Sequence, residues 1–163
     1  MASCWLWVAF ALAATLLAAC PQAVPIVQPL QFSHRAHISN GLPCVACHAT
    51  VEQAAAAGMP QLETCMLCHR GAITDSPEEE KVRQSADAGV ELHWQRLYRL
   101  PDYVYFSHRR HVAQGRIDCT RCHGDIGDST APPPRSAVRH MMADCMECHA
   151  ERQVSNDCIR CHV

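Results

Sequence analysis

Hydrophobic and polar residues are distributed unevenly along this 163-residue chain. Residues 1–19 contain no charged side chain and seventeen hydrophobic ones. The pattern beyond them predicts three short helices, at residues 50–57, 74–89 and 138–150. Ser76 and Pro77 are placed to start the second of these helices. The Ala-Pro-Pro-Pro run at 131–134 predicts a loop, because proline interrupts a helix. We therefore expect a mainly irregular fold with a few short α-helices and few strands.

The apolar N-terminus predicts a targeting segment rather than part of the fold. Its end, Leu-Ala-Ala-Cys at residues 17–20, resembles a bacterial lipobox, which implies a signal peptide over 1–19 and a lipid on Cys20. An uncleaved anchor is the alternative, although sixteen helical residues span only about 24 Å of a hydrocarbon core of about 30 Å. Either interpretation puts the remaining chain outside the cytoplasm, at the periplasmic face of the membrane. Residues 20–31 contain three prolines and predict an extended tether.

Cysteine carries the strongest chemical signal in the chain. Ten of the twelve cysteines fall into the pattern C-x-x-C-H, which attaches c-type haem through two thioethers and ligates its iron with the histidine. From this composition about 0.06 matches are expected by chance, whereas five are present. Disulfide frameworks do not need the histidine, and structural zinc sites use other spacings. The sequence predicts five covalent haems, attached at Cys44, Cys47, Cys65, Cys68, Cys119, Cys122, Cys145, Cys148, Cys158 and Cys161, with the iron ligands His48, His69, His123, His149 and His162.

A second pattern occurs twice, 74 residues apart. Residues 32–37 read F-S-H-R-A-H and residues 106–111 read F-S-H-R-R-H. Each iron needs a ligand on its second face, and two histidines three residues apart can reach different haems. The pairs therefore predict bis-histidine ligation by His34, His37, His108 and His111.

The fifth distal ligand remains open. His140 lies five residues before Cys145 and is our first choice. The alternatives are His93 and a methionine, with Met142 preferred over Met59 and Met141.

The repeats divide the chain into successive segments. Few aromatic residues remain for a protein core, so we expect the chain to wrap around stacked haems and to depend on them for folding. The net charge of −2 gives no support for nucleic-acid binding. The predicted segments are the signal peptide (1–19), the tether (20–31), a first unit with two haems (32–73), a charged linker (74–93) and a second unit with three haems (94–163).

Two resemblances accompany these patterns. F-x-H-x-x-H ahead of C-x-x-C-H resembles the class III multihaem cytochromes c, which implies that His34 faces the Cys44 haem and His108 the Cys119 haem. In that family the second histidine of each pair crosses to another haem. Residues 94–111, WQRLYRLPDYVYFSHRRH, are similar to the multihaem subunits of quinol-oxidising membrane complexes such as Alternative Complex III and the quinone reductase complex. This likeness implies redox partner subunits.

These observations predict an electron-transfer protein rather than an enzyme. Five haems ligated on both faces conduct electrons between a quinol-oxidising or other respiratory module and an extracytoplasmic acceptor. The alternatives are a multihaem reductase with one open haem site and a structural or haem-storage protein. No catalytic residue is predicted.

Overall fold

The computed structural model describes residues 25–162. The predicted signal peptide, Cys20 and the beginning of the tether lie outside the described residues. Within them there is no β-strand, and one isolated antiparallel bridge joins Val104 to His162. The expectation of an irregular chain with short helices is confirmed. The helical elements are α2 (His34–Ser39), α3 (Cys44–Cys47), α4 (Leu62–Met66), α5 (Pro77–Ala88), the π-helix η1 (Arg110–Gln114), α6 (Thr120–His123), the 3-10 helix η2 (Ile126–Asp128), α7 (Met142–Glu151) and α8 (Cys158–Cys161).

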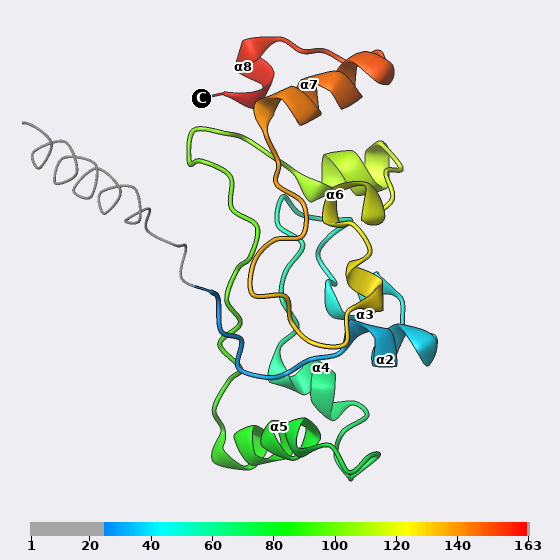
Figure 1. Cartoon of the computed structure of the whole chain (residues 1–163), viewed down its shortest axis with the longest axis vertical. Coiled ribbons are helices and arrows are strands. Elements are labelled where there is room, and N and C mark those ends of the chain that lie inside the picture. Colours follow the sequence, from blue (N-terminus) through cyan, green and yellow to red (C-terminus); the bar gives the residue numbers. More distant parts are fainter. Residues whose placement is uncertain (1–24, 163) are drawn as a thin grey trace, which may run out of the picture.

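These elements are spread along the long axis of an elongated molecule (Figure 1). Helices α4 and α5 lie together at one end, and α7 and α8 lie together at the other. Long irregular segments run between the two ends and connect them. No helix within residues 25–162 has the length and apolar character needed to cross a membrane.

The apolar core is small, as the composition predicts. Among the described residues only Leu30, Val51, Leu62 and Val82 are buried hydrophobic side chains. Three of them, on the N-terminal segment, α4 and α5, form a cluster to which Trp94 adds a partly buried ring. A core of this size is far below what a domain of this length normally buries.

Helix α5 begins and ends as the sequence predicts. Ser76 is its N-cap and its hydroxyl accepts the backbone N–H of Glu78, with Pro77 in the first turn. Gly89 ends the helix in the left-handed conformation, with φ of 64°. The segment is nevertheless more than a solvated linker, because Glu79 and Val82 are buried and the helix packs against α4.

The helix expected over residues 50–57 is absent, and a series of turns stands in its place. The carbonyls of Ala54 and Ala55 accept the backbone N–H groups of Arg109 and His108, so they are directed toward the second histidine pair. The Thr50 hydroxyl donates to the Ala56 carbonyl, which also closes the segment into a turn. Tertiary hydrogen bonds thus override the helix propensity of the alanines.

Helix α7 starts four residues later than expected. Its N-terminus is fixed at Met142 because the Asp144 carboxylate accepts the backbone N–H of Met141. Val138 and His140 consequently lie in irregular chain before the helix. The Cys145 motif lies within the helix, as predicted.

Candidate haem-binding sites

Each C-x-x-C-H motif overlaps a helix, and in α3 and α8 that helix is a single turn. In α3 and α8 the two cysteines are the first and last residues of the helix. The backbone N–H of the following histidine donates to the carbonyl of the first cysteine, over 3.0 Å at His48 and 2.9 Å at His162. Cysteines three residues apart share one face of a helix. The turn therefore presents both thiols together and directs the histidine beneath them.

The ten cysteines are free thiols in the structure, exposed or partly buried, so none is consumed by a disulfide within the described chain. Several come from different motifs and yet lie close together. Burial raises the pKa of Cys119, and the neighbouring Cys44 thiol raises it further. Burial likewise raises the pKa of Cys65, with a contribution from Cys47.

Thiols from different motifs are also neighbours further along the chain. Burial raises the pKa of Cys122, with a contribution from Cys148. Burial also raises the pKa of Cys145, and the neighbouring Asp144 and Cys161 raise it further. The motifs are therefore neighbours in the order Cys65, Cys44, Cys119, Cys145 and Cys158. Figure 1 shows the helices that carry them along the long axis, with α4, α3 and α6 in succession and α7 and α8 together at the end.

The two F-S-H-x-x-H segments have the same local geometry. The ring of Phe32 stacks on His37 at 4.4 Å and 24°, and the ring of Phe106 stacks on His111 at 4.5 Å and 24°. Each phenyl ring also meets the first histidine of its segment edge-on, at 4.9 Å in both copies. The sequence repeat is thus a structural repeat, and each phenylalanine orients both histidines of its pair.

The backbone carbonyl four residues before the second histidine has a role that sequence analysis missed. Nδ1 of His37 lies 2.8 Å from the carbonyl of Ser33, and Nδ1 of His111 lies 2.8 Å from the carbonyl of Ser107. Such a bond fixes the tautomer and leaves Nε2 free for a metal. Every residue type offers this carbonyl, so no residue identity in the sequence could have shown the contact.

Other predicted ligands are held in the same way. Nδ1 of His48 lies 2.9 Å from the carbonyl of Gly58, and Nδ1 of His108 lies 2.9 Å from that of Ala55. His149 contacts the carbonyl of Ser155 at 3.0 Å. Since each bond occupies Nδ1, the Nε2 atoms of these rings are the available metal donors.

Four pairs of rings have the spacing of two imidazoles on opposite faces of one metal ion, and the fourth is His123 with His140 at 6.4 Å. With a metal–nitrogen bond of about 2.0 Å, two such rings have centroids about 6.3 Å apart. The other observed separations are 6.1 Å for His37 and His69, 6.3 Å for His108 and His123, and 6.2 Å for His111 and His149.

Burial favours the neutral, metal-binding form of two predicted ligands, His123 and His34. It lowers the pKa of His123 to about 4, with His108 as the next cause. It also lowers the pKa of His34, and the neighbouring His48 contributes to that shift. Neutral imidazole is the metal-binding form, and the effect on His34 indicates that it lies near His48.

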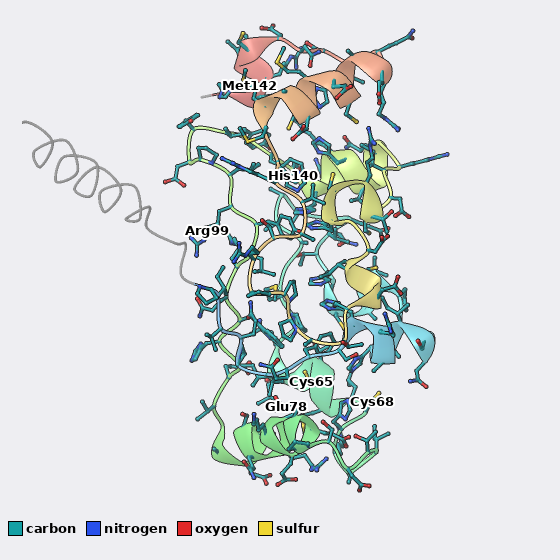
Figure 2. All side chains as sticks on the ribbon, viewed as in Figure 1. Cys65, Cys68, Glu78, Arg99, His140 and Met142 are labelled. Atoms are coloured by element: carbon teal, nitrogen blue, oxygen red, sulfur yellow. The ribbon has the colours of Figure 1, made fainter. Side chains whose placement is uncertain are left out.

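The remaining predicted ligands are arranged differently. The ring of His140 lies 5.5 Å from Tyr98 and 6.4 Å from His123. His162 instead stacks with Tyr103, at 5.8 Å and 28°. Figure 2 shows His140 in the irregular segment that leads to α7 and Met142 at the start of that helix. His93 is exposed.

The residues present fit a haem better than a bare metal ion. Within residues 25–162, no three His, Cys, Asp or Glu side chains come together as a metal site. A porphyrin itself supplies four ligands, so two opposed imidazoles complete the coordination. The Tyr98 hydroxyl and the Trp94 Nε1 are buried without a hydrogen-bond partner. Buried donors of this kind indicate a missing acceptor, and haem propionates are acceptors.

One backbone feature distinguishes the second histidine pair from the first. His111 lies in the π-helix η1, whereas His37 lies in the α-helix α2. The wider turn closes at Gly115, whose N–H donates to the Arg110 carbonyl. A Cβ at Gly115 would lie 2.6 Å from the His111 carbonyl, so only glycine fits here.

Paired imidazoles, thiol-bearing turns and a small apolar core together define a multihaem c-type cytochrome. The chain belongs to the family described as cytochrome c7 and related cytochrome c, whose sequence profile matches residues 30–87 and 104–163. It is an electron-transfer protein that binds c-type haems.

A curated relative supports the same assignment. The chain is 32% identical over 160 residues to the menaquinone reductase, multiheme cytochrome c subunit, of Nitratidesulfovibrio vulgaris strain Hildenborough. The match covers 83% of this chain and 76% of the relative. The predicted resemblance to cytochrome subunits of quinone-linked complexes is confirmed.

Proposed function

We propose that the protein is a pentahaem cytochrome c subunit of a quinone-linked membrane complex. It passes electrons between a quinol-oxidising or other respiratory module and an extracytoplasmic acceptor. The observation that carries this proposal is the row of five C-x-x-C-H motifs, whose thiols neighbour each other from motif to motif. Each bound haem supplies an iron that takes up and releases one electron.

The chain's own residues set the conditions for this transfer. The ten motif cysteines fix the five cofactors in order, and their histidines bind from one face. We assign the distal ligands as His34 with His48, His37 with His69, His108 with His123, and His111 with His149. These assignments are supported by the ring separations and by the neighbouring rings of His34 and His48.

Two rings compete for the iron beside His123. His108 and His140 lie at nearly equal distances from it. His108 has Nδ1 at the Ala55 carbonyl, the arrangement found at the other distal ligands. We therefore place His108 on this iron and retain His140 for the Cys158 haem, with Met142 and His93 as alternatives.

The alternative function is a multihaem reductase with an open haem position, and we would place that position at the Cys158 haem. His162 is the motif histidine whose ring faces Tyr103 rather than another imidazole. A ferric high-spin electron paramagnetic resonance (EPR) signal that responds to nitrite would favour this alternative. A fully low-spin spectrum supports the electron-transfer function.

Membrane attachment belongs to the same proposal. A lipid on Cys20 and the tether over 20–31 would hold the protein at the periplasmic face, beside its partner subunits. The relative's name makes quinone an electron acceptor, whereas quinol oxidation runs the other way. A row of haems conducts in both directions, and the potentials of the partners decide which is used.

Two measurements test the proposal. Intact mass and a pyridine haemochrome assay should give five covalent haems in protein matured by a complete haem-attachment system. Mild detergent extraction should recover the protein with a polytopic membrane subunit, and the complex should exchange electrons with a menaquinol analogue. Four or fewer haems, or a monomer in every mild detergent, would contradict it.

A further inference from the structure

A buried carboxylate lies behind one of the motif histidines. Glu79, in the first turn of α5, has a side chain only 4% exposed, and its Oε1 lies 3.4 Å from Nδ1 of His69. No hydrogen bond among the described residues satisfies this nitrogen, which is also buried. The Glu79 carboxylate is therefore the acceptor within reach of His69.

This arrangement differs from that at six other predicted ligands. Nδ1 of His37, His48, His108, His111 and His149 lies against a neutral backbone carbonyl. Nδ1 of His34 lies against the Ser129 hydroxyl. Within the described chain, His69 is the motif histidine whose Nδ1 faces a carboxylate.

The surroundings keep this carboxylate in place and charged. Its Oε1 accepts the Ile73 N–H at 2.6 Å and lies 2.9 Å from Arg83 Nη1. Its Oε2 accepts both the N–H and the hydroxyl of Thr74, at 3.0 and 2.8 Å. The carboxylate is thus held by two backbone N–H groups, the Thr74 hydroxyl and the ion pair with Arg83.

An anionic acceptor at Nδ1 makes an imidazole a stronger electron donor through Nε2. A stronger donor favours ferric over ferrous iron and so lowers the reduction potential. The adjacent Arg83 weakens this effect on the potential, because its guanidinium binds the same Oε1 atom that faces His69.

We propose that Glu79 is a positioning residue that lowers the reduction potential of the Cys65 haem by accepting the Nδ1–H of His69. The inference rests on the proposed function, in which His69 ligates that haem. Because the Cys65 motif stands at one end of the row, beside α5, Glu79 gives the row a low-potential terminus. Electrons then tend to leave this end toward the Cys44 haem.

The test is a redox titration of the full-length holoprotein, followed by optical absorption and EPR. Glu79→Gln should shift the reduction equilibrium of one haem about tenfold toward the ferrous state, or about 59 mV for one electron. The EPR g values of the same haem should move. Arg83→Met should shift the same haem in the opposite direction, because Glu79 then acts on His69 alone.

The chain offers a matched control on the same helix. Glu80 is exposed and pairs with Arg83, but it has no contact with His69. Glu80→Gln removes the same charge, and it should leave the g values unchanged. Equal shifts in Glu79→Gln and Glu80→Gln would show a general charge effect and overturn the proposal.

A merely structural role of Glu79 makes a different prediction. It would give shifts of the same sign, or none, in Glu79→Gln and Arg83→Met, and that result also overturns the proposal. If Glu79→Gln does not mature, Arg83→Met still decides, since it retains the carboxylate. The haem count is separate: five haems with unmoved potentials refute only the effect of Glu79, whereas fewer than five refute the proposed function.

Discussion

Removal of His111 is the sharpest test of the ligand assignment. His111 lies in the second repeat, and its ring is 6.2 Å from His149, which belongs to the Cys145 motif. His111→Ala removes the distal ligand of that haem and leaves the ligands of the other four in place. We expect one of five ferric haems, about one fifth of the iron, to become high-spin.

The structure also indicates that this variant stays folded. The side chain stacks on Phe106 and bonds to the Ser107 carbonyl. The aromatic pair contributes about 0.5–1.5 kcal/mol, and the hydrogen bond a similar amount. A loss of about 1–3 kcal/mol is smaller than the 5–15 kcal/mol of a typical domain, so the spectrum should report ligation rather than unfolding.

Spin quantitation by EPR at low temperature measures the result, and circular dichroism monitors the fold. Arg109→Ala is the matched control, because Arg109 is exposed, lies two residues away and has no side-chain hydrogen bond in the described chain. The corresponding change in the first repeat, His37→Ala, should give the same fraction, and the double variant about two fifths, because the two sites are independent. A fully low-spin spectrum for His111→Ala, or two high-spin haems, would refute the assignment.

The remaining predictions concern the anchor, the fifth ligand and folding. Cys20→Ala should release the protein from the membrane or block its processing, as fractionation and N-terminal sequencing will show; unchanged retention with an intact N-terminus indicates an uncleaved helix instead. His140→Ala should create a high-spin haem. A near-infrared band of methionine-ligated ferric haem that disappears in Met142→Ala would instead identify Met142 as the fifth distal ligand. Protein made without haem attachment should lack a cooperative thermal transition by circular dichroism, because only four apolar side chains are buried in the described chain; a sharp transition would contradict that dependence.

The sequence predicts the elements whose signals are local. Ser76 and Pro77 locate the start of α5, and the C-x-x-C spacing produces the single-turn helices α3 and α8. The duplicated F-S-H-x-x-H predicts two equivalent segments, and the stacked phenyl and imidazole rings agree with it.

What the sequence could not show depends on distant partners. The alanines at 54 and 55 favour a helix, but their carbonyls bind residues more than fifty positions later. Glu79 looks like one of three solvated glutamates in a row, and only the packing of α5 against α4 brings it to His69. The position of His140 beside Tyr98 likewise follows from an irregular segment that has no pattern to predict it.

The two repeats hold each other's histidines. The carbonyl of Ala55, in the first repeat, orients His108 of the second, while Ser129 of the second repeat contacts His34 and binds the backbone of Arg35 in the first. Neither repeat alone contains the group that orients its own first histidine, so each repeat needs the other to position that ring. His34 therefore obtains its contact with the Ser129 hydroxyl only after the second repeat has been synthesised and has folded beside the first.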